Sequence, residues 1–191
     1  ENTLIPHYNF FDVNGKFVFR ASEIDRITLS GFHGKDFLYN PPASKDVAYD
    51  INWGNTTLNL NWLRLAEEKK FTSVSLNYTG YRFQTIITDK NPDAFKQDFY
   101  STSSIEDFAV RIDGQYFSTD NHTVKNGIEV ILHNFNLVNN NFFVPTLADD
   151  ERIGTDISSI ETAAYIQDEW QITPLWFMNA GVRLYYFPRA R

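Results

Sequence analysis

The amino-acid sequence predicts an all-β fold, an antiparallel transmembrane β-barrel. Three observations point to it: runs of alternating apolar and polar residues succeed one another, the connections between them are alternately short and long, and aromatic residues gather near the ends of the runs. Membrane barrels combine these features because short turns lie on one side of the bilayer, long loops lie on the other, and aromatic side chains occupy both interfaces.

The composition excludes several other classes of protein. Of the 191 residues 42% are hydrophobic, yet the mean hydropathy is −0.37, and no stretch approaches the roughly 20 apolar residues that a spanning helix needs. The net charge of −7 argues against nucleic acid as a partner, because phosphate binding requires a basic surface. The lack of cysteine in the sequence excludes disulfides, thiolate metal sites and cysteine nucleophiles.

Four strands are predicted in the first half of the chain, because apolar residues recur there at every second position. The strands and their apolar phases are residues 11–20 with Phe11, Val13, Gly15, Phe17 and Phe19; residues 26–35 with Ile27, Leu29 and Gly31; residues 56–65 with Leu58, Leu60 and Trp62; and residues 71–83 with Val74, Leu76 and Tyr78. The opposite phase is mostly polar.

Four further strands are predicted in the second half for the same reason. They are residues 107–116 with Phe108, Val110, Ile112, Gly114 and Tyr116; residues 124–133 with Val124, Ile128, Val130 and Leu132; residues 164–172 with Ala164, Ile166, Trp170 and Ile172; and residues 176–186 with Trp176, Met178, Ala180, Val182, Leu184 and Tyr186. Asp168 is the one residue that violates the apolar phase of the seventh strand.

The connections between these strands fall into two length classes. The short, polar turns are residues 22–25, 66–70, 119–122 and 173–174, and long loops are expected near residues 40–51, 89–104 and 138–158. Membrane barrels place the short turns in the periplasm and the long loops outside the cell. The predicted strands are also longer than the five or six residues that are typical of globular sheets, on the order of twice that length.

Aromatic residues lie near both ends of the predicted strands. Close to the short turns are Trp62, Trp170 and Trp176, and close to the long loops are Tyr8, Trp53 and Tyr186. Bilayer interfaces select two such belts. They favour a membrane barrel over a soluble β-sandwich, whose strands alternate in the same way.

The order of turns and loops places both ends of the sequence on one side. The first predicted strand runs into a short turn and the last one leaves a short turn, so residues 1 and 191 are both expected outside the cell. A complete barrel of a single chain keeps both ends in the periplasm. We therefore expect about eight strands of a larger barrel.

Two stretches near the end of the sequence carry a recognisable pattern, ETAAYIQDEWQITPLW at residues 161–176 and MNAGVRLYYF at residues 178–187. Together they resemble the barrel hairpin of TonB-dependent outer-membrane transporters. NHTVKNGIE at residues 121–129, DRITLSG at residues 25–31 and WGNTT at residues 53–57 resemble the version of these receptors that is common in Bacteroidetes.

The resemblance implies a 22-stranded barrel in the bacterial outer membrane with a plug domain inside it. Residues 1–191 would be a section of the barrel wall without the plug. The implied function is active uptake of a scarce nutrient such as a siderophore, glycan, peptide or vitamin. The implied partners are outer-membrane lipid, the plug and the TonB system, the nutrient, and a surface lipoprotein. No bond of the substrate is made or broken, so neither enzymatic activity nor a cofactor is expected.

Two alternatives from other classes remain open. The first is a complete eight-stranded outer-membrane barrel, porin-like or structural, which requires residues 11–20 to pair with residues 176–187. The second is a soluble β-rich binding module, which would stay folded without detergent. The pairing of the first and last strands distinguishes the first alternative from the transporter, and the location of the protein in the cell distinguishes the second.

Charged residues on the polar phase are the first set of candidate site residues. They are Arg111, Asp113, Lys125, Glu129 and Arg183. Charges of both signs on a lumen face can pair across strands, bind a plug or contact the substrate. Pairing between strands or with the plug is the favoured interpretation, because such pairs occur along the whole height of polar lumens.

Aromatic residues of the third long loop are the second set of candidates, namely Phe135, Phe142 and Phe143. They could stack on a sugar, peptide or chelate, or pack against a neighbouring loop or a partner protein, and the sequence does not separate these roles. The four histidines show no metal-ligand spacing, and no arrangement of nucleophile and base is evident. We therefore predict neither a metal site nor catalytic residues.

Overall fold

The computed structural model describes residues 6–40, 47–66, 69–89, 99–142 and 152–188. These residues form a single antiparallel sheet. Its strands are β1 (His7–Arg20), β2 (Asp25–Asn40), β3 (Val47–Ala66), β4 (Lys70–Asp89), β5 (Phe99–Thr119), β6 (His122–Phe142), β7 (Arg152–Ile153), β8 (Asp156–Thr173) and β9 (Trp176–Tyr186). In these ranges no helix is long and apolar enough to cross a membrane.

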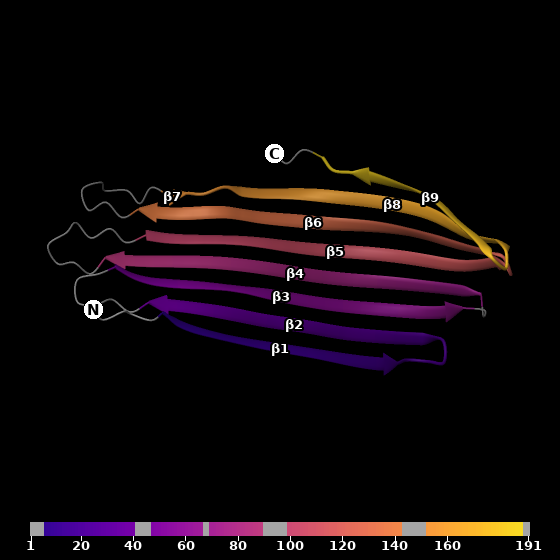
Figure 1. Ribbon diagram of the computed structural model, residues 1–191, viewed down its shortest axis with the longest axis horizontal. Helices are drawn as coiled ribbons and strands as arrows, with labels where there is room; N and C mark the ends of the chain where they lie inside the picture. Colours follow the sequence, from indigo (N-terminus) through magenta and orange to yellow (C-terminus); the bar gives the residue numbers. More distant parts are fainter. Residues whose placement is uncertain (1–5, 41–46, 67–68, 90–98, 143–151, 189–191) are drawn as a thin grey trace.

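Each long strand pairs with its neighbour in the sequence. The order across the sheet is β1-β2-β3-β4-β5-β6-β8-β9, and the two-residue strand β7 pairs with β6. Figure 1 shows the strands running side by side, with the tight turns at one end and the long connections at the other. The structure thus confirms the predicted all-β, antiparallel fold, with every predicted strand in place.

The strands extend further toward the loop end than the sequence predicts. The sequence predicts residues 47–51, 99–104, 138–142 and 156–158 in long loops, but they belong to β3, β5, β6 and β8. Side-chain alternation requires different surroundings on the two faces of a sheet, whereas backbone pairing does not. Where both faces meet the same surroundings the alternation ends, although the hydrogen-bonded ladder continues.

The register sorts the side chains onto two faces. One row across the sheet consists of Phe19, Ile27, Trp62, Val74, Ile112, Ile128, Ala164 and Leu184. We call the face that carries this row the apolar face. The adjacent row points to the opposite, polar face and consists of Val18, Thr28, Asn61, Ser75, Arg111, Glu129, Ala163 and Tyr185.

The sheet is a single layer without a hydrophobic core. Ala48 and Ala163 are the only buried apolar residues in the described part of the chain. Large side chains of the apolar face are exposed, for example Val110 at 45% and Ile128 at 58%. A soluble sheet buries its apolar face against a second layer of structure, and in the described ranges no second layer covers this one.

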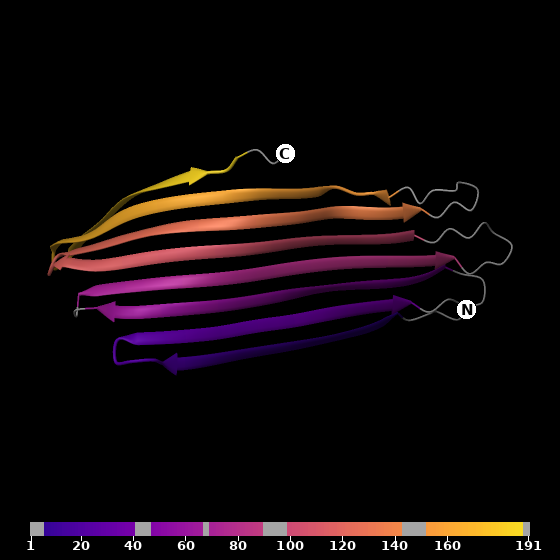
Figure 2. The same ribbon diagram turned by 180° about the vertical axis from the view of Figure 1, so that it is seen from behind.

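The short turns are staggered across the sheet, as Figures 1 and 2 show. The last pair of the first hairpin is Arg20 with Arg26, and its row leads across the sheet to Arg183. The last pair of the final hairpin is Thr173 with Trp176, and on β9 Trp176 is seven residues closer to the short turns than Arg183. The row from β1 to β9 crosses seven strand-to-strand steps, so the turns shift by one residue per strand. One residue per strand corresponds to a tilt of about 35°, at about 3.3 Å per residue and 4.8 Å between strands, which is the tilt of strands in barrels.

The apolar band has the height of a membrane. On β5 it runs from Phe108 to Tyr116, about 26 Å along the strand at ~3.3 Å per residue. With a tilt of about 35° this is about 22 Å perpendicular to the plane of the turns, close to the roughly 25 Å apolar band of membrane barrels. Above it, toward the long connections, β4 and β5 continue for about nine further residue pairs, from Thr79–Asp107 to Ile87–Phe99.

Candidate functional site

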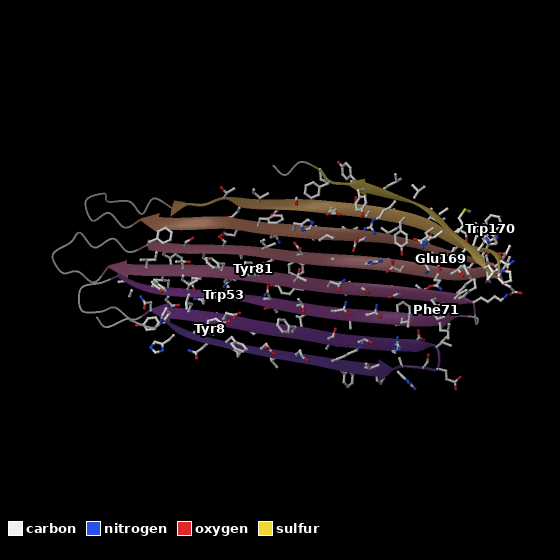
Figure 3. The ribbon with its side chains drawn as sticks, in the orientation of Figure 1. Tyr8, Trp53, Phe71, Tyr81, Glu169 and Trp170 are labelled. Atoms are coloured by element: carbon white, nitrogen blue, oxygen red, sulfur yellow. The ribbon has the colours of Figure 1, made fainter. Side chains whose placement is uncertain are left out.

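Two groups of side chains stand out on the polar face. The first, the charged network, consists of Arg111, Asp113, Lys125, Glu129, Tyr165, Glu169 and Arg183. The second, the aromatic stripe, consists of Tyr8, Phe10, Trp53 and Phe83. Figure 3 shows that Tyr8 and Trp53 lie toward the long-connection end of the sheet, whereas Glu169 lies at the end with the short turns.

Asp113 is the acceptor at the centre of the charged network. Its Oδ2 accepts a hydrogen bond from Nε of Arg111 at 2.7 Å, within the same strand. Its Oδ1 accepts a hydrogen bond from the hydroxyl of Tyr165 on β8, also at 2.7 Å. Both carboxylate oxygens therefore have donors, and the half-exposed guanidinium of Arg111 is held in a fixed position.

Two further ion pairs cross between strands. Nζ of Lys125 on β6 donates to Oε1 of Glu169 on β8 at 2.6 Å. Nη2 of Arg183 on β9 donates to Oε2 of Glu129 on β6 at 2.9 Å and so spans the intervening strand β8. Cross-strand pairs of opposite charge contribute about 0.2–1 kcal/mol each.

The structure thus places all five predicted charged residues on one face and pairs each of them. Arg111, Lys125 and Arg183 also line a hollow of about 480 Å³ together with Tyr165 and Gln167. Their side chains are 32–42% exposed. The hollow therefore offers cationic donors that can bind carbonyl or carboxylate oxygens of a segment lying against the polar face.

The aromatic stripe crosses the first four strands near the long connections. Phe10, Asp36, Trp53 and Phe83 lie in one row of the register. The ring of Trp53 stacks against Phe83 at 6.5 Å and against Tyr8 at 6.3 Å between centroids. Tyr8 also stacks on Phe10 at 6.0 Å, and its hydroxyl donates to Asp36. The stripe presents flat apolar faces beside a carboxylate, an arrangement suited to a planar or ring-shaped ligand.

The sequence interpretation missed this stripe. It placed Tyr8 and Trp53 in an interfacial belt because both lie near strand ends, but the register directs both side chains to the polar face. The sequence contains the information, because Trp53 is an even number of positions from the polar Asn59 and an odd number from the apolar Leu60. Trp53 therefore points to the same face as Asn59. Tyr186 does lie on the apolar face, in the row of Leu60.

The predicted loop aromatics lie elsewhere than expected. Phe135 is inside β6, on the polar face, where its ring stacks on His133 at 5.7 Å. Phe142 is the last residue of β6 and pairs with Phe99. Both are therefore strand residues and not loop residues, because β6 continues through the asparagine-rich segment. Phe143 falls outside the described residues.

Three of the four histidines take part in ordinary polar contacts. Nδ1 of His122 lies 2.7 Å from Oδ2 of Asp168, and Nδ1 of His133 lies 2.7 Å from Oδ1 of Asp107. His33 contacts the hydroxyl of Thr56 at 2.9 Å. Over the part of the chain that the structure covers, no group of three His, Cys, Asp or Glu side chains is arranged to hold a metal ion.

Comparisons with known proteins add one similarity in fold. No protein-family model matches the sequence, and no curated protein matches it. Among solved structures, the chain is similar to the ferric yersiniabactin uptake receptor FyuA from Yersinia pestis, with a TM-score of 0.63 and 12% sequence identity over 92% of this chain. The match covers 27% of the receptor chain, so this sequence spans about a quarter of it. At this identity the similarity concerns the fold alone.

Proposed function

We propose that this chain is a section of the wall of an outer-membrane β-barrel that takes up a nutrient by TonB-dependent active transport. The apolar face contacts lipid and the polar face lines the lumen. Further strands, in the same polypeptide or another, pair with β1 and β9 and close the barrel. The fold similarity to an uptake receptor and the sequence resemblance to TonB-dependent transporters support this proposal.

The observation that carries the proposal is the uncovered apolar face. Leu29, Leu60 and Leu76 stand side by side in one row and are 40–49% exposed. Covering a side chain of this kind is worth about 1.5–3 kcal/mol, and the face carries such residues on every long strand. A contiguous apolar face of this size marks a membrane or a partner, and its band height and strand tilt match a membrane.

A larger barrel is favoured over a complete barrel of eight strands. The smaller barrel requires β1 to pair with β9. In the described residues β1 pairs with β2 and β9 pairs with β8, so these two strands are the opposite edges of the sheet. A soluble module is disfavoured because its sheet would leave the apolar face in water.

Within this transporter the two groups on the polar face have different roles. The charged network, whose Arg111, Lys125 and Arg183 line the hollow, contacts a plug domain. The aromatic stripe around Trp53 lies above the apolar band and contacts the nutrient as it enters. A surface lipoprotein and the TonB system are further partners. No bond in the nutrient changes, so these residues position and bind rather than catalyse.

The orientation of the two faces can be tested with single cysteines, because the sequence contains none. In the full-length polypeptide, otherwise free of cysteine, Leu60→Cys in outer membranes should react with a lipid-soluble maleimide. Asn61→Cys should react with a small water-soluble maleimide. Equal reaction of both positions with the water-soluble reagent, or recovery of the protein in the soluble periplasmic fraction, would refute the membrane assignment.

The transport function needs a separate test. Strains with and without this protein are grown on limiting ferric siderophore, glycan, peptide or vitamin, and each culture is repeated in a strain that lacks TonB. We expect growth on one nutrient class to require both the protein and TonB. Growth that requires the protein but not TonB would show passive diffusion through a pore.

A further inference from the structure

A polar groove lies on the apolar face at the loop-side border of the apolar band. The last apolar row there is Gly31, Leu58, Tyr78 and Phe108, and the next two rows are His33, Thr56, Gly80 and Glu106, then Lys35, Gly54, Arg82 and Ser104. Together with Asn52, Tyr78 and Tyr81, the residues of these two rows line a groove of about 300 Å³. All of them except Tyr81 lie on the apolar face, so the groove opens mainly on the face that we assign to lipid.

Two cations flank the middle of this groove. Lys35 and Arg82 lie in one row on either side of Gly54, so their Cα atoms are about 10 Å apart at ~4.8 Å per strand. Gly54 has no side chain, and the stem of Lys35 occupies part of that space, because its Cγ would lie 3.4 Å from a Cβ at position 54. Lys35 therefore lies beside Gly54 on one side of the groove, and Arg82 flanks Gly54 on the other side.

Neither cation is neutralised by a carboxylate in the described part of the chain. Elsewhere on the sheet the cations of Arg64, Lys125 and Arg183 have carboxylate partners. Nζ of Lys35 instead lies 4.9 Å from the centroid of the Phe37 ring. The one carboxylate of the groove, Glu106, accepts a hydrogen bond from the hydroxyl of Tyr78 at 3.4 Å.

The groove lies at the level in the membrane where lipid head groups are expected. Phe11 on β1 is the register partner of Lys35 and is an exposed apolar residue, so on the neighbouring strand the apolar band reaches the level of Lys35. Arg82 lies two strands further along the same row, and with the tilt of about 35° this places it about 5 Å higher. Lys35 and Arg82 therefore stand where hydrocarbon gives way to charged head groups.

We propose that this groove binds the phosphate of an anionic lipid in the outer leaflet. The Arg82 guanidinium can donate two parallel hydrogen bonds to phosphate oxygens, and Lys35 supplies a point charge from the other side. Hydroxyl groups of Thr56 and Ser104 provide further donors. The proposal rests on the proposed function, because it requires the apolar face to contact lipid.

The test measures lipid binding to the full-length protein purified from outer membranes in a non-ionic detergent. Native mass spectrometry follows titration with dioctanoyl phosphatidylglycerol, with the zwitterionic dioctanoyl phosphatidylcholine as a parallel arm. The double variant Lys35→Gln/Arg82→Gln should bind phosphatidylglycerol at least tenfold more weakly. The matched variant Lys16→Gln/Arg26→Gln, which removes two cations from the polar face, should bind it like the parent protein.

A third arm separates the source of the phosphate. Inorganic phosphate at the same concentration should not displace phosphatidylglycerol, because it gains no contact with the apolar band below the groove. Displacement by inorganic phosphate, equal affinity of Lys35→Gln/Arg82→Gln, or equal binding of phosphatidylcholine would each overturn the proposal. The cysteine labelling at position 60 reports the membrane orientation independently, so a lipid-exposed Leu60→Cys with unchanged lipid binding would refute this inference alone.

Discussion

The hydroxyl of Tyr165 reaches across a whole strand to donate a hydrogen bond to Oδ1 of Asp113. The two residues belong to β8 and β5, and Gly127 of β6 lies between them in the same row. The ring of Tyr165 occupies the space that a side chain at position 127 would need. The hydrogen bond therefore depends on glycine at this position, and Gly127 is buried beneath the ring.

Gly127→Ala should destabilise the sheet by about 1–3 kcal/mol. An added Cβ would overlap the Tyr165 ring and would lie 2.6 Å from Oδ1 of Asp113, so both side chains must move, at a cost typical of overpacking. Urea unfolding of the full-length protein in lipid vesicles measures the change. Gly15→Ala is the matched control, because a Cβ at position 15 has no atom within 4 Å. An equal loss in both variants would show that the effect is one of glycine in a strand and not of Tyr165.

Tyr165→Phe should lower the free energy of unfolding by less, about 1 kcal/mol, because it removes one hydrogen bond while the ring remains over Gly127. The Arg111 guanidinium still donates to Asp113, so this carboxylate keeps a partner. The same urea titration gives the value. A loss as large as that of Gly127→Ala would assign the main contribution to the hydroxyl and not to the fit of the ring.

The ion pair between Arg183 and Glu129 should tolerate exchange of its charges. Glu129→Arg alone places two cations together, whereas Glu129→Arg/Arg183→Glu restores opposite charges across β8. We expect the double variant to recover at least part of the stability that the single variant loses, with a coupling of about 0.2–1 kcal/mol for a half-exposed pair. A double-mutant cycle in urea measures it, and a coupling of zero would contradict the pairing.

Position 110 and its neighbour should respond differently to a positive charge. Val110→Arg places the charge in the apolar band and should cost about 2–4 kcal/mol in a bilayer. Ala109→Arg places it on the polar face of the same strand, between Asn77 and Ile131, and should cost less than half as much. Insertion and unfolding in lipid vesicles of the two variants provide the comparison. Equal costs would contradict the assignment of the faces.

Trp53→Ala should weaken nutrient binding by about tenfold, since loss of an aromatic stacking partner costs about 0.5–1.5 kcal/mol beyond its buried area. Trp53→Phe keeps a ring and should retain most of the affinity. Trp62→Phe changes an indole on the opposite face, where Nε1 donates to Asp25 at 2.9 Å, and should leave nutrient binding unchanged. Whole-cell binding of the nutrient identified by the growth test measures all three. Unchanged affinity of Trp53→Ala would remove the aromatic stripe from the binding surface.

Much of the fold was predictable because alternation is a local signal. Leu58 and Leu60 flank Asn59, and this spacing alone identifies a strand with two different faces. The exception at Asp168 has a cause on another strand, which the sequence alone could not show. Asp168 lies on the apolar face, where its Oδ2 is 2.7 Å from Nδ1 of His122, and the His122 ring stacks on Trp170.

Relationships across several strands were not predictable, because they depend on register. Arg183 and Glu129 are 54 residues apart in sequence, with a strand between them, and no spacing rule connects them. That Lys35 and Arg82 lie in one row can be recognised only when the pairings of β2 with β3 and of β3 with β4 are known. The loop-side ends of the strands were not predictable for a different reason. β6 continues to Phe142, but in its last segment apolar and polar residues no longer alternate.

The stagger of the turns also bears on the width of the whole barrel. A slip of one residue per strand, continued around a closed barrel, adds up to about as many residues as there are strands. With a tilt of about 35° and ~4.8 Å between strands, a ring of about 22 strands would have a radius of about 20 Å. Such a bore admits a folded domain and not merely side chains. In the barrel that we propose, the stagger of the short turns and the number of strands together therefore set the width of the bore.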